Sequence, residues 1–298
     1  MKTVATIGIG AIIALFSARL NAIAALIEPQ ETETVTIEFK LQDDYAILVP
    51  AKLRNGPSIH VMIDTGSAET LLDGALAKRL KLKSHENMRI VLWSDVIAGK
   101  RVTVDHIKIG NLDFASQSML AANLDRFSAD LHTPIDLVVG YNMLCTLDSF
   151  QIDYAAKVLS LVRSAPTERN HRCDDHSLPI FNAVIPGHKL LRLLVDTGVQ
   201  GLVLFGEDRE YGASNIDSSG GRHSNALPGF NMRRVQLPNI DFGGETAVNH
   251  PRAYLIEPRP PNLSWIDGFL GGDGEIGLSS LRIDMHNQTV RLRFRGQP

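Results

Sequence analysis

The feature that most limits the fold of this chain is a short motif that occurs twice. The stretch VMIDTGSAETLL (residues 61–72) places Asp64 at the end of an apolar run, and LLVDTGVQGLVLF (residues 193–205) places Asp196 in the same position. A carboxylate at the end of a buried strand is costly unless it is hydrogen-bonded or paired. Two such carboxylates in equivalent places therefore predict that Asp64 and Asp196 meet in the folded protein.

Landmarks downstream of each motif keep the same spacing. PIDLVVG ends at Gly140 and WIDGFLG ends at Gly271, and these glycines are 131 residues apart. The stretches FQIDY and LRIDM repeat at the same interval, with Asp153 matching Asp284. Such self-similarity indicates a duplicated domain. We expect an N-terminal lobe over residues 31–162 and a C-terminal lobe over 178–294, joined by a polar, aperiodic linker over 163–177.

Most of each lobe is predicted to be strand. Segments such as TVTIEFKL and RVTVDHIKIG are short, rich in β-branched residues and separated by Gly, Pro, Asn and Asp turns. One helix is expected in DGALAKRLKL, where Leu72, Leu76 and Leu80 share a face and Asp73 is placed to cap the start. The sequence thus predicts a mostly β protein with few short helices.

Composition and the N-terminus bear on partners and location. The chain has 298 residues and a net charge of −3, which gives no general attraction to nucleic acid. Residues 1–24 have the charge, apolar run and small-residue end of a signal peptide, with cleavage expected after Ala24. An uncleaved membrane anchor is the alternative. We expect export to the periplasm or the cell exterior, without stable membrane insertion once the signal is removed.

Two cysteines, Cys145 and Cys173, are present. Export would allow a disulfide between them, and a buried free thiol at Cys145 is the alternative.

Two other sequence patterns are not interpreted as binding sites. HRCDDH (residues 171–176) has metal-ligand residue types but no matching ligand pair, and GDGEIG (residues 272–277) lacks the helix of a dinucleotide site. No metal site is predicted.

The chemistry of two facing Asp-Thr-Gly turns follows from their residue types. Glycine allows a tight turn close to another group, and threonine offers a hydroxyl to the opposite turn. Carboxylates held close together cannot both ionise, so they share a proton. The ionised member can then take a proton from water, while the protonated member polarises a carbonyl oxygen. Hydrolysis by this route needs no cofactor.

At these residues the chain resembles the retropepsin-type aspartic proteases. The resemblance rests on IDTGSA and VDTGV, each followed by a hydrophobic-hydrophobic-Gly strand, and it covers both lobes. It implies two homologous retropepsin- or pepsin-like β-barrel lobes related by a pseudo-twofold axis, and a peptide or protein substrate. The family often builds its site from two identical chains, whereas a duplicated chain implies a complete site in one monomer.

The resemblance also implies residue roles. Asp64 and Asp196 would form the catalytic dyad. The residues that would support it, by reciprocal threonine bonds, by glycine turns and by a serine hydroxyl, are Thr65, Gly66, Ser67, Thr197 and Gly198. The candidates for a flap or cleft are Trp93, Gly99 in a hairpin with its tip expected at residues 98–100, and Gly229 in the C-terminal lobe.

The two motifs differ at one position. Ser67 follows the first motif and could donate its hydroxyl to Asp64, whereas Val199 follows the second and has no hydroxyl. We therefore expect Asp64 to be the more readily ionised base and Asp196 the more readily protonated acid. Val199 also leaves open a catalytically inactive, protease-like peptide-binding protein, and an enzyme that processes only itself is a further alternative.

Overall fold

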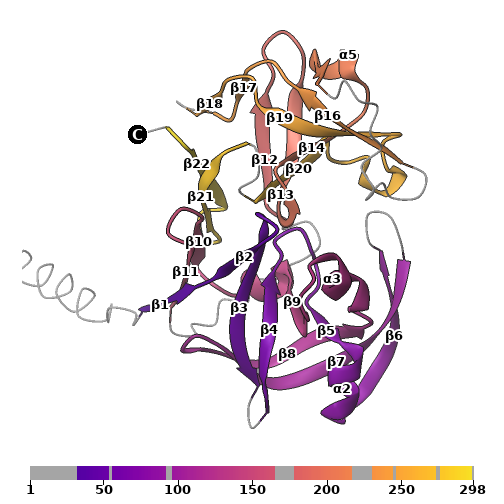
Figure 1. The fold of residues 1–298 in the computed structure, drawn as a ribbon. Coiled ribbons are helices and arrows are strands. Elements are labelled where there is room, and N and C mark those ends of the chain that lie inside the picture. Colours follow the sequence, from indigo (N-terminus) through magenta and orange to yellow (C-terminus); the bar gives the residue numbers. More distant parts are fainter. Residues whose placement is uncertain are drawn as a thin grey trace, which may run out of the picture.

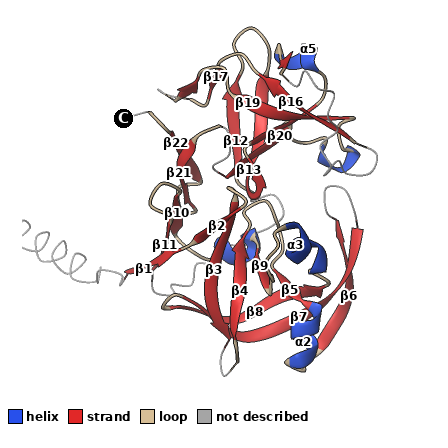
Figure 2. Ribbon diagram, viewed as in Figure 1, coloured by secondary structure: helices blue, strands red, loops and turns tan. Residues whose placement is uncertain are grey.

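The computed structural model describes residues 32–53, 56–91, 96–164, 178–216, 230–243, 246–272 and 276–296. Strands dominate these residues and the helices are short (Figure 2), which confirms the predicted fold class. None of the helices in the described ranges has the length and apolar character needed to cross a membrane. The predicted signal peptide lies outside the described residues.

An eight-stranded sheet makes up most of the predicted N-terminal lobe and lies within residues 40–139. Its strands are β2 (Lys40–Gln42), β3 (Ala46–Leu53), β4 (Ser58–Ile63), β5 (Leu71–Asp73), β6 (Ser84–Val91), β7 (Val96–Ile109), β8 (Leu112–Ala122) and β9 (Leu137–Val139). In space they follow the order β2-β3-β4-β9-β5-β8-β7-β6. The strand β4, which delivers Asp64, therefore lies inside the sheet and is buried along its last three residues.

The C-terminal lobe, residues 180–272, forms a nine-stranded sheet. Its strands are β12 (Ile180–Val184), β13 (Leu190–Gln200), β14 (Leu202–Phe205), β15 (Ser214–Asn215), β16 (Asn231–Gln236), β17 (Ile240–Asp241), β18 (Ala247–Val248), β19 (Arg252–Glu257) and β20 (Gly268–Gly272). The run β12-β13-β20-β14-β19-β16 matches β3-β4-β9-β5-β8-β7 of the first lobe strand for strand, including which neighbours are parallel. This common order supports the predicted duplication.

A five-stranded sheet, which we call the interlobe sheet, joins the two lobes along one side (Figure 1). Its order is β1-β11-β10-β21-β22, with β1 (Thr32–Glu38), β10 (Ser149–Asp153), β11 (Val158–Ser164), β21 (Leu278–Asp284) and β22 (Thr289–Phe294). Strands β10 and β21 carry the repeated FQIDY and LRIDM stretches, and they pair with each other antiparallel. Gln151 lies opposite its own counterpart Arg282, which is the register that a twofold relation between the repeats requires.

Strand β11 includes Arg163 and Ser164, the first two residues of the predicted linker. The rest of that linker, residues 165–177, lies outside the described residues and includes Cys173. Cys145 is disulfide-bonded, which excludes the free-thiol alternative. Its pairing with Cys173 stays a prediction.

Within the described residues, helices are few and lie mainly at strand ends. They are α2 (Gly74–Arg79), α3 (Asp125–Asp130), α4 (Tyr141–Leu144), α5 (Asp208–Tyr211) and the 3₁₀ turn η1 (Pro261–Leu263). In α2 the side chain of Asp73 accepts a hydrogen bond of 2.8 Å from the backbone N–H of Leu76, so the predicted cap is confirmed. The helix is shorter than the predicted apolar face requires, because Leu72 lies on β5 and Leu80 is the C-cap, so only Leu76 of the three leucines lies within α2, where it is fully buried.

Candidate active site

The two Asp-Thr-Gly segments meet between the lobes. We call residues 64–70 the first loop and residues 196–201 the second loop. Asp64 directly follows β4, and Asp196 lies within β13, which reaches the upper ends of β3 and β4 (Figure 1). Both aspartates therefore arrive at the lobe junction on buried strands.

Reciprocal threonine bonds fasten the two loops to each other. The Thr65 hydroxyl donates to the carbonyl of Val195 at 2.7 Å, and the Thr197 hydroxyl donates to the carbonyl of Ile63 at 2.8 Å. Each hydroxyl also accepts from the backbone N–H of the opposite threonine, at 3.1 Å in both directions. Because both threonines are buried, these bonds face no competition from water. The reciprocal arrangement predicted from the sequence is confirmed.

The glycines of the two loops lie against the opposite aspartates. A Cβ atom built on Gly66 would lie 2.1 Å from Cγ of Asp196, and one built on Gly198 would lie 2.9 Å from Cγ of Asp64. Neither position can hold a side chain without displacing a carboxyl group. The structure thus brings Asp64, Asp196, Gly66 and Gly198 together, in the crossed arrangement that facing loops require.

The two carboxyl groups hydrogen-bond to each other, and both have a raised pKa. Burial and the charge of Asp64 hold the pKa of Asp196 well above its usual range, although the backbone N–H of Gly198 acts against them. Burial also raises the pKa of Asp64, but its bond with Asp196 and the backbone N–H groups of Gly66 and Ser67 act in the opposite direction. These directions agree with the predicted order, in which Asp64 ionises first.

The predicted cause of this order is wrong. The Ser67 hydroxyl does not reach Asp64, because it donates to the carbonyl of Glu69 at 2.7 Å. Instead the backbone N–H groups of Gly66 and Ser67 donate to Oδ1 of Asp64 at 3.0 and 3.1 Å, while Asp196 receives such a bond from Gly198 at 2.8 Å. The serine side chain therefore does not cause the difference between the two carboxyls, whereas the additional backbone donor on Asp64 contributes to it, beside the mutual bond and the charge of Asp64.

Ser67→Ala is therefore expected to leave the acidic limb of the kcat/KM profile against pH in place, because the backbone N–H survives the change. Val199→Ser should be equally silent, because the backbone N–H that donates to Asp196 belongs to Gly198 and is untouched by the change. Steady-state assays with a peptide substrate from pH 3 to pH 8 measure this. A movement of the limb by about one pH unit in Ser67→Ala would show that the hydroxyl does tune Asp64.

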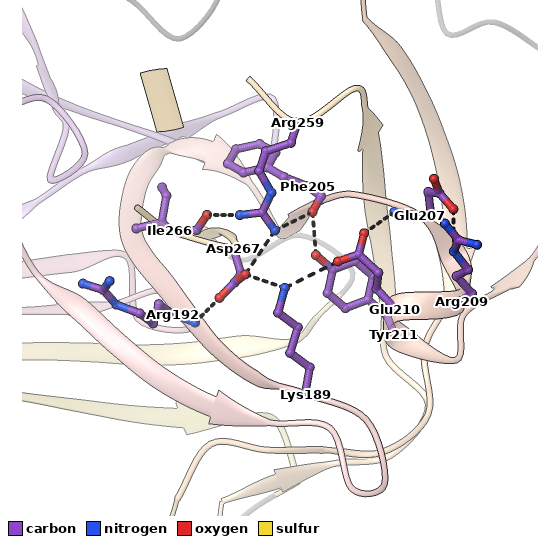
Figure 3. Close-up of polar contacts among 10 residues, drawn as sticks. All are labelled: Lys189, Arg192, Phe205, Glu207, Arg209, Glu210, Tyr211, Arg259, Ile266 and Asp267. Atoms are coloured by element: carbon purple, nitrogen blue, oxygen red, sulfur yellow. Dashed lines mark hydrogen bonds and ion pairs between the residues drawn. The ribbon is translucent and has the colours of Figure 1, made fainter. Parts of the chain in front are cut away.

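A further aspartate in each lobe holds the strand that carries the dyad residue. Asp136, just before β9, accepts a bond of 2.9 Å from the backbone N–H of His60 on β4. Asp267, just before β20, accepts the equivalent bond of 2.9 Å from Arg192 on β13 (Figure 3). Sequence reasoning missed both residues, although they occupy the same place in PIDLVVG and WIDGFLG.

Asp267 also anchors an ion cluster that Asp136 lacks. Lys189 contacts its Oδ1 at 2.8 Å and Arg259 does so at 3.1 Å, and Arg259 continues to the carbonyl of Phe205 (Figure 3). Although burial opposes it, these bonds lower the pKa of Asp267 below its usual range. A cavity of about 690 Å³ borders this cluster, and its lining residues include none from the two loops.

None of the three flap or cleft candidates is placed at a hairpin tip by the described residues. Strands β6 and β7 form a hairpin, but Gly99 lies within β7, opposite Met88 on β6 and Ala122 on β8. The predicted tip at residues 98–100 is therefore wrong, because the two strands pair as far as Val91 and Val96. Trp93 and Gly229 lie outside the described residues.

One comparison with known proteins agrees with the first motif. The family model described as aspartyl protease matches residues 49–143, a segment that contains the first loop and Gly140. This match confirms, over the N-terminal lobe, the family resemblance indicated by the sequence. Among solved structures the chain is similar to a retropepsin-like aspartic protease from Rickettsia conorii, with 20% identity, a TM-score of 0.32, and coverage of 47% of this chain and 98% of that chain. The comparison with curated proteins gave no significant match.

Proposed function

We propose that this protein is an aspartic endopeptidase that hydrolyses peptide bonds with a water molecule activated between Asp64 and Asp196. The observation that carries the proposal is the pair of mutually hydrogen-bonded carboxyls, raised in pKa to different extents, on a framework of reciprocal threonine bonds. Two carboxyl groups held this close together share one proton, because both cannot be charged at once.

Each group has a role in the proposed reaction. Asp64, the more readily ionised member, removes a proton from the attacking water. Asp196 keeps its proton and donates a hydrogen bond to the carbonyl oxygen of the scissile bond, and it then helps to protonate the leaving nitrogen. Thr65 and Thr197 hold the two carboxyls in position, so that little reorganisation is needed as charge develops.

A single chain supplies both halves of the proposed site, so a monomer should suffice. The substrate would be a peptide or protein segment lying between the lobes above the dyad. Export to the periplasm or beyond, through residues 1–24, remains part of the proposal. The main alternative is a protease-like protein that binds peptides without cleaving them, and the apolar Val199 beside the second Asp-Thr-Gly is the feature that favours it.

Hydrolysis of a mixed peptide library by the mature chain, from acid to neutral pH, separates these functions. Cleavage that disappears in Asp64→Asn and in Asp196→Asn supports the endopeptidase. Binding of peptides by the wild type without cleavage at any pH supports the peptide-binding protein. The mass of the mature chain before and after incubation shows whether it cuts only itself.

A further inference from the structure

The β6–β7 hairpin leaves the N-terminal sheet at a defined point. Strand β7 pairs with β8 from Ile109 back to Gly99, but residues 96–98 pair only with β6. The part of the hairpin beyond Gly99 is therefore two-stranded, and Figure 1 shows β6 running along the side of the N-terminal lobe toward the C-terminal lobe. Gly99 is the last residue of β7 that pairs with β8, and we call it the root of the hairpin.

One arginine at that root reaches the first loop. Arg101 lies on β7 two residues from Gly99, and its guanidinium contacts Oε1 of Glu69 at 3.1 Å. The same guanidinium lies 3.7 Å from Oε2 of Glu86 on β6. Arg101 thus connects both strands of the hairpin to the loop that carries Asp64. Its side chain is 28% exposed, so water screens the pair only in part.

The other end of this connection is fixed. The second carboxylate oxygen of Glu69 accepts from the Asn142 side-chain amide at 3.2 Å, and the amide oxygen of Asn142 accepts from the Thr70 hydroxyl at 2.7 Å. That hydroxyl in turn accepts from the backbone N–H of Gly140 at 3.1 Å. Glu69 is therefore held by Asn142, which is itself bonded to Thr70. Its carboxylate has a set position when it contacts Arg101.

The second loop has no carboxylate at the equivalent position. Gly201 occupies the position in the second loop that Glu69 occupies in the first, 132 residues earlier in the chain. The connection is thus a property of one lobe, and it adds an asymmetry to the site beyond that of the two aspartates.

We propose that the ion pair between Arg101 and Glu69 positions the β6–β7 hairpin relative to the dyad and so favours the arrangement that holds a bound peptide. Arg101 is a positioning residue here, because it acts through the hairpin and touches neither dyad carboxyl. The proposal rests on the proposed endopeptidase function. Its consequence is specific: losing the pair should weaken the hold on substrate and leave proton transfer unchanged.

Arg101→Met keeps the length of the side chain and removes its charge. We expect it to raise KM about three- to tenfold, with kcat and the pH profile close to those of the wild type. Arg101→Lys should recover part of the loss. The matched control is Arg163→Met, because Arg163 is also 28% exposed and pairs with a glutamate at 3.2 Å, but it lies in the interlobe sheet. A KM no higher than that of the control, or a fall in kcat alone, would overturn the proposal.

Hydrogen exchange gives a readout that does not need catalysis. Backbone amides of β6 and of the first residues of β7 should exchange faster in Arg101→Met and in Glu69→Gln than in the wild type or in Arg163→Met. Equal exchange in all four proteins contradicts the proposal even where peptides are cleaved. Faster exchange in Arg101→Met and Glu69→Gln, together with a wild type that cleaves no peptide, would support the contact while refuting the endopeptidase.

Discussion

Replacing either dyad aspartate by asparagine is expected to lower kcat/KM for peptide hydrolysis by about 10²- to 10⁴-fold. Asp64→Asn removes the group that takes the proton from water, and Asp196→Asn removes the acid that bonds to the carbonyl oxygen. Both changes are nearly isosteric, so the threonine bonds between the loops should survive. Progress curves on one cleaved peptide, with active-site concentration normalised by protein mass, measure the effect.

The control for this prediction is Asp153→Asn. Asp153 accepts from the backbone N–H of Ala156 in a turn of the interlobe sheet and takes no part in the site, so its variant should keep activity within about twofold. Asp64→Asn should melt no lower than the wild type at pH 7, because burial penalises the charge that it removes. Undiminished activity in Asp64→Asn or Asp196→Asn would contradict the proposed mechanism.

Gly66→Ala is expected to abolish most activity without touching a titrating group. The added methyl would lie 2.1 Å from Cγ of Asp196 and 2.3 Å from its Oδ2, so the carboxyl or the whole second loop must move. Because a misplacement of about 1 Å in a catalytic group can cost roughly 10²-fold, we expect at least that loss in kcat/KM. Overpacking should also lower the free energy of unfolding by about 1–3 kcal/mol.

Gly198→Ala and Gly74→Ala complete the test. In Gly198→Ala the nearest Asp64 atoms are 2.9 Å from the new methyl, so a smaller loss is expected. Gly74 lies at the start of α2, where the nearest atom is 3.3 Å away, and its alanine variant should keep most activity. Thermal melts and kcat/KM for the three variants should rank in this order. Full activity in Gly66→Ala would mean that the loops do not face each other as described.

Much of the fold and the site could be predicted from residue types and spacing. Strand-forming segments and turn residues are local signals, so the mostly β class followed from them. The dyad, the crossed glycines and the threonine bonds followed from two copies of one motif, because equivalent segments in a duplicated fold occupy equivalent places. The cap of α2 by Asp73 is also a local signal and was correct.

What failed depends on contacts that spacing does not encode. The Ser67 hydroxyl had two acceptors within reach, and only the folded loop shows that it donates to Glu69. Glycine favours turns, but Gly99 lies within a strand and makes room for the Ile90 side chain, which a Cβ would approach to 2.8 Å. The bonds of Arg101 and Asp267 join segments far apart in sequence, so no local pattern predicts them.

The central claim is that Asp64 and Asp196 share one proton, and titration of their carboxyl carbons by NMR tests it most directly. In protein labelled with ¹³C at aspartate, with the two signals assigned through the asparagine variants, we expect two well-separated steps. The Asp196 signal should titrate well above the range usual for aspartate, and Asp64→Asn should move that step to lower pH because its charge is gone. Two independent titrations near pH 4, unchanged when the other carboxyl is removed, would contradict the account.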